Sequence, residues 1–475
     1  MDSKLKSVYE AQDFKRVGHE LIELLADYLK DTAEEKIPVM KWSEPSEQFE
    51  FWKKFTENSS DPLELFKNLI DRSIHLHHPK YMGHQLCPPA PISALISLLG
   101  ELVNNGMAIY EMGPAATAIE KVIIELIARK IGYDENGDGY ITSGGTIGNL
   151  TAMLAARQNA VKSDIWEEGL NENLGVMVSS EAHYSVDRAL RIMGFGSKGI
   201  IKIPVNEEYS ILTDLLETYY QKATEDGIKV IAVVGCAPST STGMYDDLQG
   251  IASFCKSKNL WFHVDGAHGG GVIFSQKYKH LISGVEHADS VVIDGHKMLM
   301  TPALLTFVMF KDKDVSYSTF NQKAQYLWEK NQDEEWFNMA RRTIECTKLM
   351  MSIKFYAILI SYGEEIFDSS VTHLYGLGEE FASKIKLRND FELALEPDSN
   401  IVCFRYKPNG ISEEETDKLN SNIRNVILKD GEFYIVQTLL GERVYLRTTL
   451  INPMTNSGIF DELLDRIEEI GNKLI

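Results

Sequence analysis

Few cysteines, short apolar runs and no basic excess set the first limits on this chain of 475 residues. The five cysteines are odd in number and show no CxxC spacing, which argues against a disulfide framework and a structural zinc site. Apolar runs reach about ten residues, short of the ~20 that a membrane-spanning helix needs. The N-terminal MDSKLKSVYEAQDFKR lacks the apolar core of a secretory signal. We therefore expect a soluble, cytoplasmic protein without a metal site.

The charge balance is acidic, with 48 Lys and Arg against 69 Asp and Glu, a net charge of −21. Such a field repels nucleic acid and acidic membrane surfaces, so we expect neither as a partner. A local pocket can still hold an anionic cofactor through backbone N–H groups. The 44% hydrophobic and 25% charged residues are typical of a globular protein and exclude a disordered chain.

The sequence pattern predicts three regions: a helical segment over 1–75, a large α/β domain over 76–365 and a small α+β domain over 366–475. Apolar residues recur every three to four positions in the first region, on one helix face. They are Phe14, Val17, Leu21, Leu24, Leu25 and Tyr28. This stripe must be covered by the chain's own body or by a second subunit, and the sequence does not choose between them.

In the large region, short apolar runs alternate with helical stretches, which predicts a mostly parallel sheet covered on both faces. The runs are 175–179, 199–205, 230–235, 260–265 and 290–294. We expect the sheet to extend to about residue 310, a long loop over 311–335 and a helix over 343–362. The C-terminal region has strand candidates at 401–406 and 443–448 and a closing helix over 458–474.

Glycines mark the turn SGGTIGNL, 143–150, between an expected strand and a helix. Such a turn exposes backbone N–H groups to an anion, although an ordinary tight turn is an equal alternative. Two further candidates follow apolar strands. Asp265 lies in FHVDGAHGGG, where open α/β sheets bind ligands, unless it only caps the turn. Lys297 lies in DGHKMLMTP, where apolar neighbours favour the neutral, nucleophilic amine over a lysine that reaches solvent.

His183 in SSEAHYSVDRAL follows another strand, and alone it indicates only a structural histidine. Together, these four signals match the needs of pyridoxal phosphate. The cofactor requires a seat for its phosphate, a cover for its ring, a carboxylate for its pyridine nitrogen and an amine for its aldehyde.

Over nearly its whole length the chain resembles the group II pyridoxal-phosphate-dependent amino acid decarboxylases, which include the aromatic amino acid, glutamate and 2,4-diaminobutyrate decarboxylases. The resemblance rests on these segments: HHPKYMGHQ, TSGGTIGNLTAMLAAR, STSTGMYDDL, WFHVDGAHGGG, ADSVVIDGHK and LRTTLINP. It implies the aspartate-aminotransferase-like fold and an obligate homodimer, with active sites at the subunit interface and N-terminal helices that clasp the partner. The implied activity is α-decarboxylation of an L-amino acid to its amine and CO₂.

The resemblance also assigns roles. Lys297 would link covalently to the cofactor, Asp265 would pair with the pyridine nitrogen, and His183 would stack on the ring. Phosphate would be held by Gly145 and Thr146 with help from His296, and Thr240 would line the pocket.

A loop tyrosine would protonate the substrate carbon after CO₂ leaves. Tyr326 is the first candidate and Tyr317 the second, and packing for shape is the alternative. Many family members carry asparagine where this chain has Asp294, and since a carboxylate repels phosphate, we expect Asp294 to point elsewhere.

Other readings stay open at this point. The chain could be an aldehyde-forming decarboxylase or another C–C lyase with the same cofactor, or a non-catalytic partner protein. The amino acid substrate does not follow from the sequence. Arg341, Arg342 and Lys348 could attract an acidic side chain or could form surface or interface ion pairs.

Overall fold

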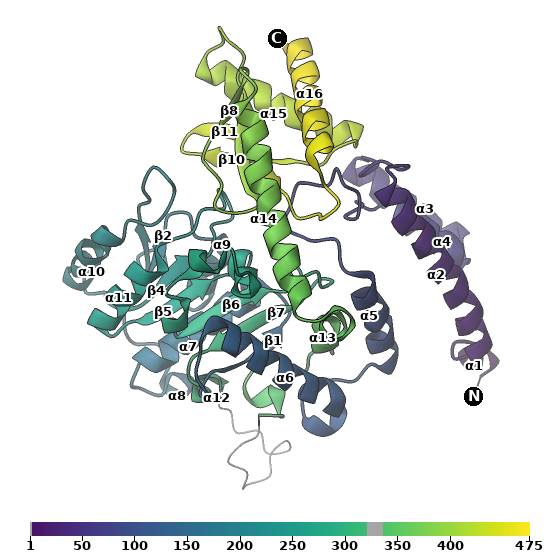
Figure 1. Cartoon of the computed structure of the whole chain (residues 1–475). Helices are drawn as coiled ribbons and strands as arrows, with labels where there is room; N and C mark the ends of the chain where they lie inside the picture. The colour runs from purple at the N-terminus through teal and green to yellow at the C-terminus, as the bar shows by residue number, and fades with distance from the viewer. Residues whose placement is uncertain (1, 321–335) are drawn as a thin grey trace. The chain divides into compact units, whose positions relative to one another are not determined.

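A computed structural model describes residues 2–320 and 336–475, which divide into two compact units (Figure 1). One unit holds the residues up to His84 together with 379–394 and 402–475. The other holds residues 85–378 and 395–401. The division into three domains that the sequence predicts stays a prediction. Among the described residues, no helix combines the length and the apolar character that crossing a membrane requires.

The first unit contains helices from both ends of the chain and a four-stranded sheet in the order β10-β11-β9-β8. Its helices are α1 (Ser3–Ser7), α2 (Ala11–Ala33), α3 (Pro45–Asn58), α4 (Pro62–Asp71), α15 (Glu413–Asp430) and α16 (Ser457–Leu474). Its strands are β8 (Phe391–Leu393), β9 (Ile401–Tyr406), β10 (Val436–Leu440) and β11 (Arg443–Thr449). Both predicted C-terminal strands and the closing helix are present.

The N-terminal helices bury almost nothing. Helices α1, α3 and α4 have no buried residue, and α2 has one, Thr32. The predicted apolar stripe lies on α2, where Phe14 is 53% exposed and Leu25 37% exposed. Because exposed apolar surface is costly in water, Phe14 and Leu25 still need a cover. The other four stripe residues, Val17, Leu21, Leu24 and Tyr28, are partly buried within the described chain.

The second unit is built on a seven-stranded sheet in the order β1-β7-β6-β5-β4-β2-β3. The strands are β1 (Asp138–Thr142), β2 (Leu174–Ser179), β3 (Ile200–Ile203), β4 (Lys229–Cys236), β5 (Trp261–Asp265), β6 (Ser290–Asp294) and β7 (Thr306–Phe310). Strands β3, β2, β4, β5 and β6 pair in parallel, whereas β7 runs antiparallel to both β6 and β1. All five predicted runs form parallel strands, as a sheet buried on both faces requires.

Helices cover both faces of this sheet (Figure 1). They are α5 (Pro91–Val103), α6 (Pro114–Ile131), α7 (Gly145–Ala160), α8 (Ile165–Glu168), α9 (Tyr184–Ile192), α10 (Leu216–Glu225), α11 (Leu248–Lys258), α12 (Asp314–Phe320), α13 (Ser352–Tyr362) and α14 (Glu365–Lys386), the last continuing into the first unit. The main core lies between α7, α9 and one sheet face and includes Val178 and Val234. On the other face α11 packs against Gly235, because neighbouring residues of a strand point to opposite sides.

Two sequence predictions were wrong in detail. The region expected as a loop over 311–335 begins with α12, where the Asp312 carboxylate accepts a hydrogen bond from the Asp314 backbone N–H at 3.0 Å. The helix expected over 343–362 begins only at Ser352. The preceding stretch is irregular because its polar side chains make tertiary contacts, among them Glu345 with the Ser143 hydroxyl and Lys348 with Glu120.

Candidate active site

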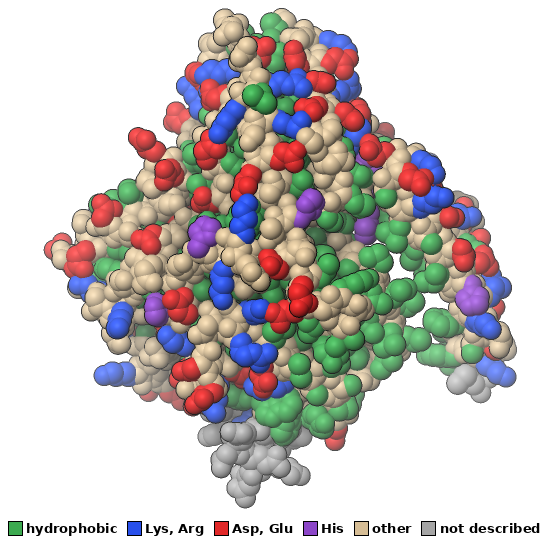
Figure 2. All heavy atoms as spheres, in the orientation of Figure 1, with side chains coloured by type: hydrophobic (Ala, Val, Ile, Leu, Met, Phe, Trp, Pro, Cys, Tyr) green, Lys and Arg blue, Asp and Glu red, His purple; other side chains and the backbone are tan. Residues whose placement is uncertain are grey.

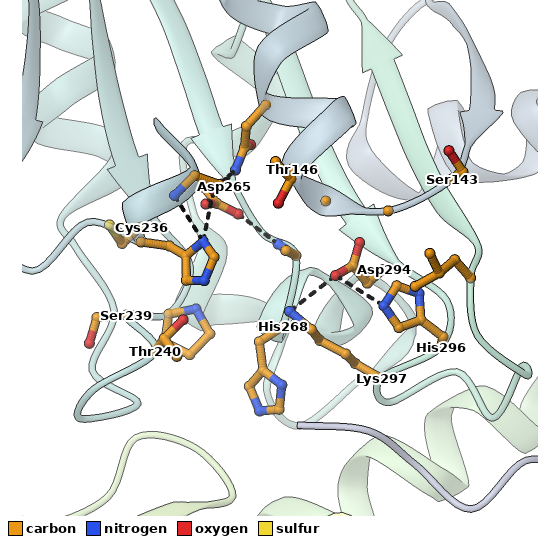
Figure 3. Close-up of a pocket in the computed structure, with 18 residues that line it drawn as sticks. Ser143, Thr146, Cys236, Ser239, Thr240, Asp265, His268, Asp294, His296 and Lys297 are labelled. Atoms are coloured by element: carbon orange, nitrogen blue, oxygen red, sulfur yellow. Dashed lines mark hydrogen bonds and ion pairs between the residues drawn. The ribbon is translucent and has the colours of Figure 1, made fainter. Parts of the chain in front are cut away.

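A cavity of about 280 Å³ opens in the second unit at the carboxyl ends of the sheet strands (Figure 3). Its walls come from the segments that follow β1, β2, β4, β5 and β6. Seven residues that the sequence singled out line it: Gly145, Thr146, His183, Thr240, Asp265, His296 and Lys297. Ligands of open α/β sheets bind at this edge, where the strands deliver side chains from distant parts of the chain to one place.

The N-terminus of α7 forms one wall of the cavity. The first backbone hydrogen bond of this helix runs from the Gly148 N–H to the Gly144 carbonyl, at 3.0 Å. The N–H groups of the residues just before Gly148 therefore face out of the helix end, where the helix dipole favours an anion. Glu345 fixes the preceding turn by accepting hydrogen bonds from the Ser143 backbone N–H at 3.2 Å and its hydroxyl at 2.7 Å.

Asp265 ends β5 and lies opposite α7. Its Oδ2 accepts a hydrogen bond from Asn149 Nδ2 at 2.8 Å, and its Oδ1 accepts one from the Ala267 N–H at 3.2 Å. The residue is 7% exposed, so these donors compensate for the water that the carboxylate loses. Asp265 is thereby held as an acceptor at the edge of the cavity.

His183 precedes α9 and faces the cavity. Its Nδ1 lies 2.8 Å from Ser185 Oγ and accepts a hydrogen bond from the Ser185 backbone N–H at 3.3 Å. Burial lowers the pKa of His183, so the ring is neutral near pH 7. With Nδ1 as the acceptor, the ring proton resides on Nε2. A neutral, flat ring in this position suits stacking on a cofactor ring.

Lys297 follows β6, and its setting differs from the apolar one that the sequence predicts. Its Nζ lies 3.0 Å from Asp294 Oδ2, so the amine faces a carboxylate (Figure 3). Thr306 Oγ1 donates to the other carboxylate oxygen at 2.5 Å, and His296 Nε2 lies 3.6 Å from Oδ2. The Lys297 side chain is 17% exposed, which leaves it accessible from the cavity.

The expectation that Asp294 points away from the phosphate-binding turn was wrong. Asp294 lines the cavity, and a Cβ atom built on Gly145 would lie 3.2 Å from both of its carboxylate oxygens. The short β6 strand directs the side chain to this edge, and the Lys297 ammonium and the Thr306 hydroxyl compensate its charge. Sequence reasoning treated the carboxylate alone and missed these partners.

Several cavity residues were missed by sequence reasoning. His268 occupies the turn after Asp265, and its Nε2 lies 2.8 Å from Asn400 Oδ1. Asn149 and Ser185 were within the quoted motifs but carried no signal of their own. Only the fold reveals that they face the same cavity.

The two proton-donor candidates fare differently. Tyr326 lies outside the described residues, so its role stays a prediction. Tyr317 lies on α12, where the Arg342 guanidinium carbon is 4.7 Å from its ring centre, and it is not among the described residues that line the cavity. Burial raises the pKa of Tyr317, which makes it a poorer acid.

Two of the three cationic candidates for binding an acidic substrate form ion pairs outside the cavity, and the third, Arg341, is not among the described residues that line it. Arg342 is 1% exposed and its Nη2 lies 2.8 Å from Asp138 Oδ2. Lys348 is buried and forms an ion pair with Glu120. These are buried structural pairs within the second unit, and among the described residues that line the cavity Lys297 is the only Lys or Arg.

The cavity residues fit pyridoxal phosphate. An anion seat at a helix N-terminus, a buried acceptor carboxylate, a neutral imidazole and a primary amine surround one space. No cluster of His, Cys, Asp and Glu that could hold a metal ion occurs among the described residues.

Comparison with known proteins gives the class. Residues 56–407 match the pyridoxal-dependent decarboxylase conserved domain, about three quarters of the chain, so the chain belongs to this family. It is a carboxy-lyase that uses pyridoxal 5′-phosphate to decarboxylate amino acids. The suspected family, the fold class and the cofactor are thereby confirmed.

The similar proteins act on different substrates by name. The chain is 29% identical over 420 residues to L-2,4-diaminobutyrate decarboxylase of Acinetobacter baumannii, which covers 85% of this chain and 82% of that protein. It is 26% identical over 474 residues to aromatic-L-amino-acid decarboxylase of Bacillus atrophaeus, covering 98% and 96%. It is 27% identical over 453 residues to human acidic amino acid decarboxylase, covering 92% and 87%.

Solved structures show the same fold. The crystal structure of mouse CSAD has a TM-score of 0.90 at 22% identity and covers 97% of this chain and 99% of that one. Oryza sativa TDC with pyridoxal phosphate and tryptamine has a TM-score of 0.88 at 20% identity, covering 98% and 99%.

Proposed function

We propose that the chain decarboxylates an L-amino acid at its α-carbon to the corresponding amine and CO₂, with Lys297, Asp265 and His183 at the centre of the reaction. The observation that carries this proposal is the convergence of these three side chains and the α7 N-terminus on one cavity. Figure 3 labels Asp265 and Lys297 among its lining residues. Family membership supports the reaction type. The structure supports the choice of residues within this chain.

Each residue has a chemical task in this proposal. When bound, pyridoxal phosphate supplies an electron-withdrawing ring that accepts the electron pair of the broken carbon–carbon bond. The Lys297 amine would hold the cofactor through its aldehyde. The Asp265 carboxylate would hold a proton at the pyridine nitrogen, and the neutral His183 ring would cover the cofactor ring and exclude water.

The phosphate end of the site is formed by the α7 N-terminus. Backbone N–H groups at Gly145 and Thr146, with the Thr146 hydroxyl, would bind the phosphate, and His296 would assist from the turn after β6. Thr240, which follows β4, would contact the cofactor from the side. Tyr326 remains the proposed donor of the proton that replaces CO₂.

A homodimer belongs to this proposal, with active sites at its interface. On α5 the apolar residues Leu95, Leu98, Leu99 and Leu102 are each at least 43% exposed and share one helix face. Figure 2 shows a broad hydrophobic area over α5 and its surroundings. Apolar patches of this kind mark association surfaces, and a second copy is the occupant that the family resemblance implies.

The direct test traps the cofactor on its lysine. The purified protein, loaded with pyridoxal phosphate and reduced with borohydride, should carry the reduced cofactor on the peptide with Lys297. The variant Lys311→Ala, which changes an exposed lysine of the same unit, should label normally, whereas Lys297→Ala should not. Label on a different lysine would refute the assignment.

The substrate test uses the twenty amino acids with diaminobutyrate, ornithine and cysteine sulfinate. CO₂, amine, aldehyde and peroxide are measured for each. Formation of amine with CO₂ supports the proposal, and aldehyde in place of amine would identify an oxidative decarboxylase instead. Cofactor binding without CO₂ from any amino acid would contradict the proposal.

The quaternary structure needs a separate measurement. Light scattering after size exclusion should report a dimer for the wild-type protein and a monomer for Leu99→Glu, because a buried carboxylate opposes association. Leu387→Glu, at an 84% exposed leucine outside the α5 face, should stay dimeric. A wild-type monomer with full activity would refute the dimer.

A further inference from the structure

Asn149 is the seventh residue of the glycine motif SGGTIGNL and the fifth residue of α7, and it is 1% exposed. Its side-chain nitrogen makes two hydrogen bonds, to Asp265 Oδ2 at 2.8 Å and to Ser185 Oγ at 2.9 Å. Since an amide nitrogen has two hydrogens, both are used. One buried side chain therefore connects Asp265, the proposed partner of the pyridine nitrogen, with Ser185, which contacts His183.

A second histidine, His263, fixes the orientation of the Asn149 amide through a contact with its oxygen. His263, in β5, is completely buried, and burial lowers its pKa to about 4, so its ring is neutral. Its Nε2 lies 3.0 Å from Asn149 Oδ1, and its Nδ1 lies 2.8 Å from Ser290 Oγ. Because the amide oxygen accepts only, Nε2 of His263 carries the proton and Nδ1 accepts from the serine.

The chain of donors and acceptors closes through Ser290 Oγ, the nearer of the two Ser290 oxygens to His263 Nδ1, at 2.8 Å against 3.2 Å for the carbonyl oxygen. Trp261 Nε1 donates to Ser290 Oγ at 2.9 Å, which leaves the serine hydrogen for His263 Nδ1. With its oxygen bound to His263, the Asn149 amide must present its nitrogen to Asp265 and Ser185. Such fully satisfied buried networks hold one geometry, because any reversal leaves a buried polar atom unpaired.

Ser185 links Asn149 to His183, the second proposed cofactor contact. Its Oγ accepts from Asn149, so its own hydrogen is free for His183 Nδ1 at 2.8 Å. Together with the Ser185 backbone N–H, which donates to the same nitrogen at 3.3 Å, this bond sets the direction of the His183 ring and keeps its proton on Nε2. Asn149 thus holds the Asp265 carboxylate directly and the His183 imidazole through Ser185.

We propose that Asn149 is a positioning residue that orients Asp265 and, through Ser185, His183 as one unit toward the cofactor. This inference rests on the proposed function, because the two oriented residues are its proposed cofactor contacts. Asn149 touches neither substrate nor reacting atoms in this account. Its effect reaches the reaction through a fixed carboxylate and a fixed imidazole ring.

The experiment compares four variants with the wild-type protein: Asn149→Ala, Asn149→Asp, Ser185→Ala and the double variant of Asn149→Ala with Ser185→Ala. The matched control is Asn420→Ala, which removes an equally buried asparagine that bonds to backbone carbonyl oxygens in the first unit. For each protein, the affinity of the cofactor-free form for pyridoxal phosphate, kcat, KM and the unfolding temperature are measured.

Asn149→Ala should weaken cofactor affinity about tenfold or more, the size expected for a lost hydrogen bond to a charged acceptor. It should lower kcat similarly while KM for the amino acid changes little. Asn149→Asp keeps the side-chain volume but turns both donors into acceptors, so it should lose at least as much affinity. Ser185→Ala should lose less, and the double variant should equal Asn149→Ala, because both changes break the same connection.

Two results would overturn the inference. Asn149→Ala could lower only the unfolding temperature, as Asn420→Ala is expected to do, with unchanged cofactor affinity. Alternatively, the effects of Asn149→Ala and Ser185→Ala could add independently. Borohydride labelling of Lys297 is measured in every variant, so loss of the label in the wild-type protein would point to failure of the proposed function rather than of this inference.

Discussion

The buried cation Arg342 offers a decisive test of which charges serve the fold and which serve the substrate. Its guanidinium is 1% exposed, lies 2.8 Å from Asp138 Oδ2 and donates through Nε to Ser316 Oγ at 3.1 Å. The Lys121 Nζ also lies 3.2 Å from Asp138 Oδ1. Since Arg342 does not line the cavity, we expect Arg342→Met to change stability and leave substrate preference unaltered.

The magnitude follows from the geometry of the pair. Removing one partner of a buried ion pair leaves an uncompensated charge and costs ~3–5 kcal/mol of unfolding free energy. Here Lys121 still compensates part of the Asp138 charge, so the lower end, about 3 kcal/mol, is expected for Arg342→Met. Asp138→Asn, which strands the arginine instead, should cost at least as much.

At acid pH, the difference in unfolding free energy between the wild-type protein and Arg342→Met should become smaller. Burial alone raises the pKa of Asp138, but Arg342 and Lys121 together hold it below its ordinary value. A carboxyl with a depressed pKa stabilises the fold above its unfolded pKa of ~3.9, and this contribution is lost as the pH falls through the folded pKa. Wild-type protein and Arg342→Met should therefore differ most near neutral pH and converge under acid conditions.

The assay combines urea unfolding at several pH values with the amino acid panel. The predicted result is a lower unfolding midpoint for Arg342→Met and the same rank order of substrates. Lys311→Met serves as a control, since that lysine is exposed. A selective loss of acidic substrates with unchanged unfolding would refute the structural assignment of Arg342.

Three further outcomes are expected. Asp294→Asn should bind pyridoxal phosphate at least as tightly as the wild-type protein, because the variant removes a negative charge near the phosphate. Its kcat should fall, because Lys297 loses its charged partner. Weaker cofactor binding in a titration of the cofactor-free variant would contradict this prediction. Tyr326→Phe should release CO₂ but divert the product from amine, which product analysis by mass spectrometry checks, and unchanged amine yield would exclude the role. Gly243→Ala should lower the unfolding temperature more than Gly227→Ala, although both have positive φ, because only the first new Cβ meets neighbouring atoms.

The sequence predicted the fold class and the strands well because their signals are local. Each parallel strand is a short apolar run, and burial on both faces makes such runs continuous. The helix α12 was missed because its seven residues are too few to show a clear helical period. The start of α13 was misjudged because the residues before it contact distant parts of the chain, as Lys348 does with Glu120. No periodicity in the sequence records such a contact.

All seven cofactor-binding candidates line one cavity, and their roles stay predictions. The sequence singled out His183, Asp265 and Lys297 because they follow apolar strands, and Gly145 and Thr146 because they lie in a glycine turn. The family resemblance added Thr240 and His296. Asp294 was misjudged because its role depends on partners 3 and 12 residues away that only the β6–β7 pairing brings together. Asn149 was missed since its partners are 36 and 116 residues away in the sequence.

By itself, the amino acid order determined most of the secondary structure, the reaction class and the residues with intrinsic reactivity, since an amine, a carboxylate and an imidazole have the same chemistry wherever they stand. Tertiary structure alone decided which charges are neutralised inside the protein and which face the cavity. It also decided which uncharged side chains orient the reactive ones. Hydrogen bonds and ion pairs form over about 3 Å in space, and the fold joins residues that are far apart in the chain.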